Sequence, residues 1–196
     1  MTDNEFSCVI RSNTDDLPKA VASIRIGERG TPGDPNSVVL VCEGASPRLR
    51  IDVYFPVADY HFTVDAVVWA GWIAVGFGAR VVLVSLDGSA TRAISLSERR
   101  PPRFADYFCQ FHSAAGFLLA CSGTTVSRIE PDGTVRWKSE ALAVDGVLIG
   151  DADDVVIEGS GEWDPPGGWR PFRLSAKTGI ILPGSDSFPE SMIASS

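Results

Sequence analysis

The chain has 196 residues, of which 44% are hydrophobic and 21% charged, and it carries a formal net charge of −8 with a sequence pI near 4.7. This length suits one domain, and the composition is that of a globular protein, which argues against a disordered or fibrous chain. The acidic balance disfavours nucleic acid and anionic lipid as partners and favours a basic protein, while a charge of this size also serves solubility.

The N-terminal segment, about residues 1–36, is the least regular part of the chain. Residues 14–24 begin with hydroxyl and acidic side chains followed by Pro18, a pattern that fits either one short helix or an extended connection into a first strand. The first six residues lack the features of a secretory signal, and the apolar stretch 64–75 is shorter than the roughly 20 residues that span a bilayer. We therefore expect a cytoplasmic protein without a membrane segment.

A short apolar segment that ends in glycine occurs four times, at residues 38–44, 72–78, 117–123 and 155–161. A second predicted strand follows each copy, at residues 48–55, 80–86, 125–129 and 169–174. Three copies then continue through a turn, at Asp87-Gly88, Asp132-Gly133 and Thr178-Gly179, into a third strand at residues 90–96, 134–137 and 180–182. Asp-Gly between β-rich runs is a strong hairpin signal because both positions tolerate positive φ.

These repeats predict an all-β fold: an antiparallel meander of about four repeated sheets, small or open and β-propeller-like, with a β-sandwich as the alternative. We expect a single domain over residues 1–196, with repeats beginning near residues 38, 72, 117 and 155 and a loose tail after residue 183.

Residues 128–137 and 172–179 resemble the blade motifs of quinoprotein-like (PQQ-type or WD40-like) propeller repeats, in which a strand ends in a D-(x)-G or T-G turn and the next strand closes on tryptophan. The resemblance implies four-stranded antiparallel blades arranged radially. Only the third copy has the closing tryptophan, Trp137, and four copies are fewer than most such rings contain. No residue matches the family's cofactor site, so we expect no cofactor.

The sequence contains no recognisable catalytic or metal-binding constellation. The two histidines, His61 and His112, precede glycine-ended segments at comparable positions and are interpreted as strand residues. The cysteines include no Cys-x-x-Cys pair, so free thiols are expected at Cys8, Cys42, Cys109 and Cys121. The acidic residues near position 151 lack the spacing of a calcium loop and predict a solvated turn instead; they are Asp151, Asp153, Asp154 and Glu158.

The loop at residues 162–169 interrupts the fourth repeat and holds Trp163 and Trp169 among prolines and glycines. Binding groups concentrate on loops of rigid scaffolds, and a tryptophan beside acidic residues suits a basic partner; the alternative is a loop folded over one end of the core. The predicted partner-binding residues are Glu162, Trp163, Asp164 and Trp169 with Asp151, Asp153 and Asp154. We expect a non-enzymatic protein-binding domain, most concretely a bacterial immunity protein that neutralises a toxin, such as a basic nuclease, by occlusion.

A second hypothesis is a small-ligand-binding or hydrolytic enzyme with a propeller pocket lined by Asp59, Asp106, Asp151 and Trp69. Asp59 and Asp106 lie in two copies of Ala-Asp-Tyr and would converge on one end of the molecule, where paired carboxylates can perform acid-base chemistry. The alternative role for these carboxylates is to cap strands and turns through backbone hydrogen bonds.

Overall fold

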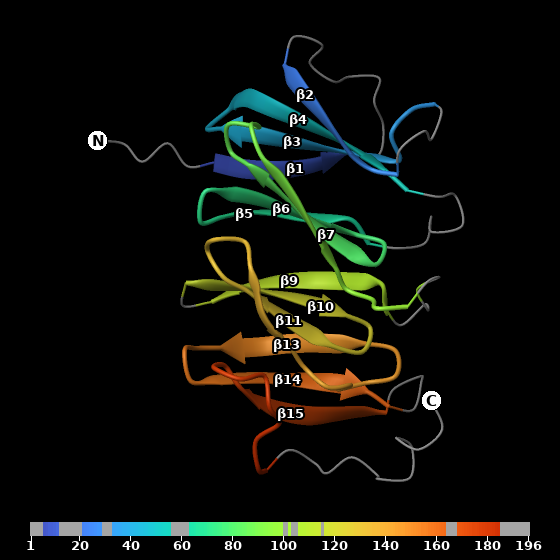
Figure 1. Ribbon diagram of the computed structural model, residues 1–196, viewed down its shortest axis with the longest axis vertical. Coiled ribbons are helices and arrows are strands. Elements are labelled where there is room, and N and C mark those ends of the chain that lie inside the picture. Colours follow the sequence, from blue (N-terminus) through green and yellow to red (C-terminus); the bar gives the residue numbers. More distant parts are fainter. Residues whose placement is uncertain are drawn as a thin grey trace.

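The computed structural model describes residues 6–11, 21–28, 33–55, 63–99, 102, 106–114, 116–163 and 168–184. Within these residues the chain forms four sheets and no helix (Figure 1). No helix in this part of the chain is therefore long and apolar enough to cross a membrane.

The first sheet has the strand order β1-β3-β4-β2 and consists of β1 (Phe6–Arg11), β2 (Ala22–Gly27), β3 (Ser37–Glu43) and β4 (Ser46–Tyr54). In this sheet β2 pairs in parallel with the outer side of β4, whereas every other pairing between the named strands is antiparallel. The residues at 22–24 are thus extended rather than helical, and residues 12–20 lie outside the described part of the chain.

The other three sheets follow the chain strand by strand. The second contains β5 (Asp65–Trp69), β6 (Trp72–Phe77), β7 (Arg80–Ser85) and β8 (Thr91–Ser95). The third contains β9 (Phe108–Ala114), β10 (Phe117–Ser122), β11 (Val126–Ile129) and β12 (Val135–Lys138). The fourth contains β13 (Val147–Ala152), β14 (Val156–Glu162) and β15 (Trp169–Ser175), with a single further bridge from Leu174 to Ile181.

The four sheets stack face to face along the long axis of the molecule (Figure 1), and their first strands, β1, β5, β9 and β13, contact one another in succession. Three buried clusters separate the sheets; they are represented by Ile51 with Val75, by Leu83 with Leu118, and by Phe117 with Phe172. A two-layer sandwich has one such interior. The predicted open, propeller-like arrangement is therefore confirmed.

The burial pattern follows from each sheet's position in the stack. Strands β6, β7 and β10 are almost continuously buried because the second and third sheets are covered on both faces. In the fourth sheet β15 instead alternates between buried and exposed residues, which is the pattern of a sheet with one solvated face. The candidate site therefore lies on the solvated face of the fourth sheet.

The glycine-ended segments of the sequence are the second strands of the sheets, β3, β6, β10 and β14. The strands predicted after them correspond to β4, β7, β11 and β15, and the third predicted strands to β8, β12 and the bridge at Ile181. Each sheet begins one strand earlier than the repeat, because β1, β5, β9 and β13 precede the glycine-ended segments.

Hydrogen bonds from side chains to backbone join the second sheet to the third. Trp72 Nε1 donates to the Pro131 carbonyl at 3.0 Å, and Arg92 Nη1 donates to the Asp132 carbonyl at 3.1 Å. Both acceptors lie in the Asp-Gly turn between β11 and β12, so this turn positions the third sheet against the second as well as reversing the chain.

Candidate protein-interaction face

The fourth sheet ends the stack, and only one of its faces is packed. Ile157, Phe172 and Leu174 point inward and are at most 1% exposed. Pairing places the outward residues in three rows across β13, β14 and β15. We call this surface the end face. Its first row is Gly146, Glu162 and Trp169, and its second row is Leu148, Ser160 and Pro171. Its third row is Asp151, Glu158 and Arg173.

Trp169 forms the aromatic part of the end face and remains 41% exposed. Its indole reaches across β14 to Gly146, where a Cβ atom would lie 3.0 Å from the ring. The carboxylate of Glu162 lies at the same place, 3.7 Å from that Cβ position. The absence of a side chain at Gly146 therefore lets the ring lie flat on the sheet with an acidic neighbour.

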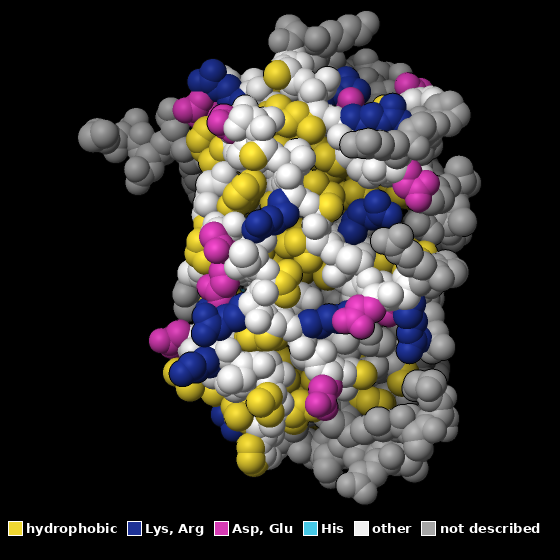
Figure 2. All heavy atoms as spheres, in the orientation of Figure 1, with side chains coloured by type: hydrophobic (Ala, Val, Ile, Leu, Met, Phe, Trp, Pro, Cys, Tyr) yellow, Lys and Arg dark blue, Asp and Glu magenta, His cyan; other side chains and the backbone are white. Residues whose placement is uncertain are grey.

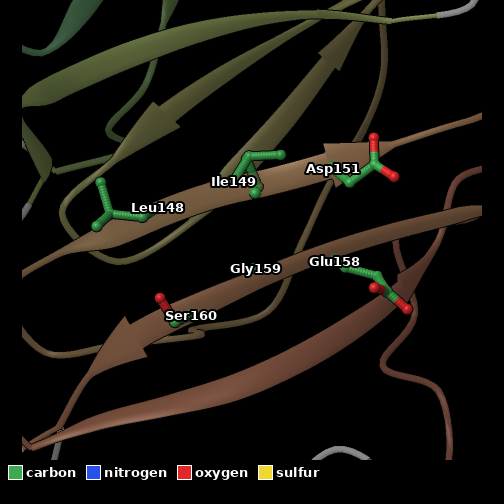
Figure 3. A pocket seen from close by; sticks show the side chains of 7 residues that line it. Leu148, Ile149, Asp151, Glu158, Gly159 and Ser160 are labelled. Carbon is green, nitrogen blue, oxygen red and sulfur yellow. The ribbon is translucent and has the colours of Figure 1, made fainter.

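A shallow depression of about 540 Å³ lies beside this ring, and Figure 3 shows the residues that line it. Leu148 and Ser160 lie at one end of the depression, and Asp151 and Glu158 at the other (Figure 3). The strand register shifts between Ile149 and Asp151, and this irregularity places Asp151 opposite Glu158. The lining also includes Ile149, Gly150 and Gly159, and a Cβ atom at Gly150 would have only the Glu158 carbonyl, at 3.8 Å, within 4 Å.

The charged end of the depression is exposed to solvent. Arg173 Nε donates to Glu158 Oε1 at 3.1 Å, with the two side chains 45% and 58% exposed. An ion pair this exposed contributes little to stability, because water and salt screen it. Asp151 Oδ1 accepts the backbone N–H of Ala152 at 2.9 Å.

Five of the seven predicted partner-binding residues fall into two groups. Asp151, Glu162 and Trp169 come together on the end face, although they are up to 18 residues apart in the sequence. Asp153 and Asp154 lie instead in the exposed turn between β13 and β14.

The Asp153 carboxylate accepts the N–H groups of Val156 and Val155, each at 2.7 Å, and these bonds lower its pKa. Trp163 is partly buried, and its backbone N–H donates to the Gly168 carbonyl at 3.0 Å. Asp164 lies outside the described residues.

Sequence reasoning did not assign six residues of this surface to partner binding: Gly146, Leu148, Glu158, Ser160, Pro171 and Arg173. Leu148 is 47% exposed, and Pro171 is also exposed. The alternation of apolar and polar residues along β15 would have indicated that residues 169, 171 and 173 share one face.

The residues of the enzyme hypothesis do not meet at this depression. Asp106 accepts a hydrogen bond from Ser97 Oγ at 2.7 Å, and Trp69 packs against the cluster between the second and third sheets. Asp151 lines the depression without either of them, and Asp59 and His61 lie outside the described residues. His112 lies in β9 opposite Leu119.

No three His, Cys, Asp or Glu residues in the described ranges are grouped so that they could hold a metal ion. The four cysteines are free thiols. Burial raises the pKa of Cys8 and of Cys109 to about 11, and that of Cys121 to about 12. These three thiols are therefore protonated near neutral pH and are poor nucleophiles.

The end face belongs to the most acidic part of the chain. Residues 139–168 contain no Lys or Arg but eight acidic residues: Glu140, Asp145, Asp151, Asp153, Asp154, Glu158, Glu162 and Asp164. On the side of the stack shown in Figure 2, by contrast, Lys and Arg are interspersed with Asp and Glu. The acidic segment therefore supplies β13 and β14 of the fourth sheet, whereas β15 contributes Arg170 and Arg173.

The opposite end of the stack is closed. On the outer face of the first sheet Val38 is 0% exposed, while Leu40 and Tyr54 are each 8% exposed. On the outer face of the fourth sheet, by contrast, Leu148 is 47% and Trp169 is 41% exposed. Among the described residues, the outer face of the fourth sheet thus presents large apolar side chains to solvent, whereas Val38, Leu40 and Tyr54 on the outer face of the first are buried.

Together these features define an open, propeller-like stack of four sheets with one exposed acidic and apolar end. No protein-family model and no curated protein sequence matches the chain. Among solved structures it is similar to the N-terminal domain of Nup159, with a TM-score of 0.45 and 11% identity over 97% of this chain and 53% of that chain. It is also similar to a prolyl endopeptidase, with a TM-score of 0.40 and 14% identity over 75% of this chain and 24% of that chain. The chain thus spans about half of the first protein chain and about a quarter of the second.

Proposed function

We propose that this chain is a non-enzymatic protein-binding domain that docks a basic partner on the end face of its fourth sheet. The observation that carries the proposal is the exposure of Leu148, within the segment 139–168 that has eight acidic residues and no basic ones, and of Trp169, which directly follows that segment. Aromatic residues are enriched among the energetically dominant residues of protein interfaces. Acidic residues around them speed the approach of a basic partner and exclude acidic ones.

The most concrete form of this proposal is a cytoplasmic bacterial immunity protein that neutralises a toxin domain, such as a basic nuclease, by occlusion. Occlusion needs a rigid surface of complementary shape and charge, and no chemistry of its own. The stacked sheets supply the rigidity, because both faces of the middle sheets are packed. The enzyme hypothesis has less support, because neither Asp106 nor Trp69 lines the depression that contains Asp151.

We also propose a relationship to quinoprotein-like repeats, and it rests on Trp137. The indole of this residue packs over Gly179 and donates a hydrogen bond to the Ala176 carbonyl in the turn that follows β15. The third repeat is the one in which a strand ends in an Asp-Gly turn and the next strand closes on tryptophan, as the motif requires. The contact of Trp137 with the Thr178-Gly179 turn gives both features a physical role.

Affinity capture from a native extract tests the proposed function. The full chain serves as bait beside a Leu148→Ser plus Trp169→Ala variant and a control, Thr91→Ala, at an exposed position of β8 in the second sheet. We expect a basic protein that wild type and control retain, that the double variant loses, and that high salt weakens. That protein, expressed alone, should inhibit growth, and co-expression of the chain should restore it. Equal retention by the double variant would overturn the proposal.

A further inference from the structure

We infer that the depression in the end face receives an aliphatic side chain of the partner. A Lys or Arg of the same partner segment lies about 7 Å further along the strands, a distance that two residues of an extended chain span. This inference rests on the proposed function and specifies the chemistry of the segment bound. It concerns the rows of Leu148 with Ser160 and of Asp151 with Glu158.

The apolar end of the depression fits an aliphatic group. Leu148 is 47% exposed, and its neighbour across the strands is the small side chain of Ser160, followed by the exposed ring of Pro171. Gly150 adds no side chain between this apolar end and the acidic row, and a Cβ atom there would have only the Glu158 carbonyl, at 3.8 Å, within 4 Å. A branched apolar side chain entering here would remove Leu148 from water, which is the main source of favourable free energy at such a contact.

The acidic end fits a cation. Two carboxylates, Asp151 and Glu158, face one guanidinium, that of Arg173, so the row carries a surplus negative charge. Because Glu158 and Arg173 are both exposed, an incoming Lys or Arg can join the pair without first breaking a buried interaction.

Charge also decides between this occupant and the other candidates. A second copy would bring together two end faces that each carry Asp151, Glu158 and Glu162 against Arg173 alone, and these would repel. The chain's own residues 185–196 contain Asp186 and Glu190 and no Lys or Arg, so they do not complement the acidic row either. A basic partner segment is the occupant that the charges favour.

Disulfide tethering to a Ser160→Cys variant of the full chain tests the inference without a known partner. The probes are three small thiols that carry an isobutyl group with a guanidinium, with a carboxylate, or with no charge, each equilibrated against 2-mercaptoethanol and measured by intact mass. Ser113→Cys, at an exposed position of β9 opposite Leu118 in the third sheet, is the matched control, and wild type gives the background from the native thiols.

At Ser160→Cys we expect the guanidinium probe to be captured two- to fivefold better than the carboxylate probe, the range that an exposed ion pair provides. Adding Asp151→Asn and Glu158→Gln should abolish the preference, and Leu148→Ser should lower capture of all three probes. No preference between probes, or the same preference at Ser113→Cys, would overturn the inference, as would a disulfide-linked dimer as the main product. None of these outcomes would affect the capture experiment, so the two proposals can fail separately.

Discussion

The indole Nε1 of Trp137 donates a hydrogen bond to the carbonyl oxygen of Ala176, 3.0 Å away, and thereby joins the outer strand of the third sheet to the end of the fourth. Arg128 Nη1 donates to the same oxygen at 2.7 Å, and its guanidinium lies 4.0 Å from the ring centroid of Phe117. The end face is therefore held in place by contacts on its opposite, inner side.

The first prediction concerns this hydrogen bond. Trp137→Phe should lower the free energy of unfolding by about 1 kcal/mol, the net value of one hydrogen bond, because Arg128 still satisfies the Ala176 carbonyl. Trp137→Ala should cost about 3 kcal/mol because it also removes the packed ring. Urea denaturation of both variants measures the two effects. Equal losses for Phe and Ala would show that ring packing contributes nothing.

The second prediction concerns Gly179, which has a positive φ of 71° and lies under the Trp137 ring, where a Cβ atom would be 2.6 Å from the nearest ring atom. Gly179→Ala should therefore destabilise the fold by more than the roughly 1–2 kcal/mol that a left-handed backbone costs a residue with a side chain. Gly44→Ala is the control, because its φ is 58° but no atom lies within 4 Å of its Cβ position. Thermal denaturation that ranks Gly44→Ala as equally damaging would contradict the clash.

The sequence predicted most second, third and fourth strands of the sheets because glycines and Asp-Gly or Thr-Gly turns separate them. It did not predict β5, which is partly exposed along its whole length, or β13, although Asp145-Gly146 directly precedes that strand. The position of β2 was also beyond prediction, since it depends on parallel pairing with β4, about 27 residues later. Pairing between distant segments leaves no local pattern.

For a related reason, the sequence predicted only part of the candidate site. Trp169, Glu162 and Asp151 stood out by residue type, and their charges and aromaticity are visible in the sequence. That they share one face depends on strand register, and the irregularity after Ile149 decides which side Asp151 faces. The contribution of Leu148 depends on the end of the stack being open, which no local pattern expresses.

A third prediction follows from the turn at Asp87. Its carboxylate accepts hydrogen bonds from Ser85 Oγ and from the Ser89 N–H and Oγ, which lower its pKa from 3.8 to about 2. The charged form is thus favoured in the folded state, so its stabilising effect is present above about pH 4 and disappears as the pH falls through about 2.

Asp87→Ala should accordingly be less stable than wild type at pH 7, with a difference that shrinks between pH 4 and pH 2. Denaturant titrations at several pH values measure this difference. Ser85→Ala, which removes the largest cause of the pKa shift, should show the same trend with a smaller amplitude. A difference that stays constant down to pH 2 would contradict the role of the carboxylate.

A fourth prediction concerns the outer edge of β15. The Arg173 carbonyl and the Ser175 N–H bond outward to Leu182 and Ile180, each at 2.8 Å, so the backbone of Pro171 also faces outward by the two-residue period of a strand. Proline has no N–H, and it protects such an edge from pairing with another chain.

Pro171→Val should therefore restore an outward N–H and promote self-association while leaving the fold intact. Ser175→Val is the control: it adds the same side chain to the same strand, where the N–H is already bound to Ile180. Light scattering across a range of concentrations should show growth for Pro171→Val only. Two monodisperse variants would mean that this edge is protected by something other than the proline.

The last prediction separates the two contributions of the end face to partner binding. Trp169 is exposed and aromatic, and removing a dominant interface residue costs about 2 kcal/mol or more, so Trp169→Ala should weaken binding about thirtyfold, mainly through faster dissociation. Asp151→Asn with Glu158→Gln should instead slow association and reduce its dependence on salt, because exposed charges act during the approach of the partner. Surface plasmon resonance at low and high salt resolves these rates for the partner obtained by capture, with Thr91→Ala as the unaffected control. If the charge variants changed only dissociation, the carboxylates would act only after docking, through their contact with the partner's Lys or Arg, and not as a guide for the approaching partner.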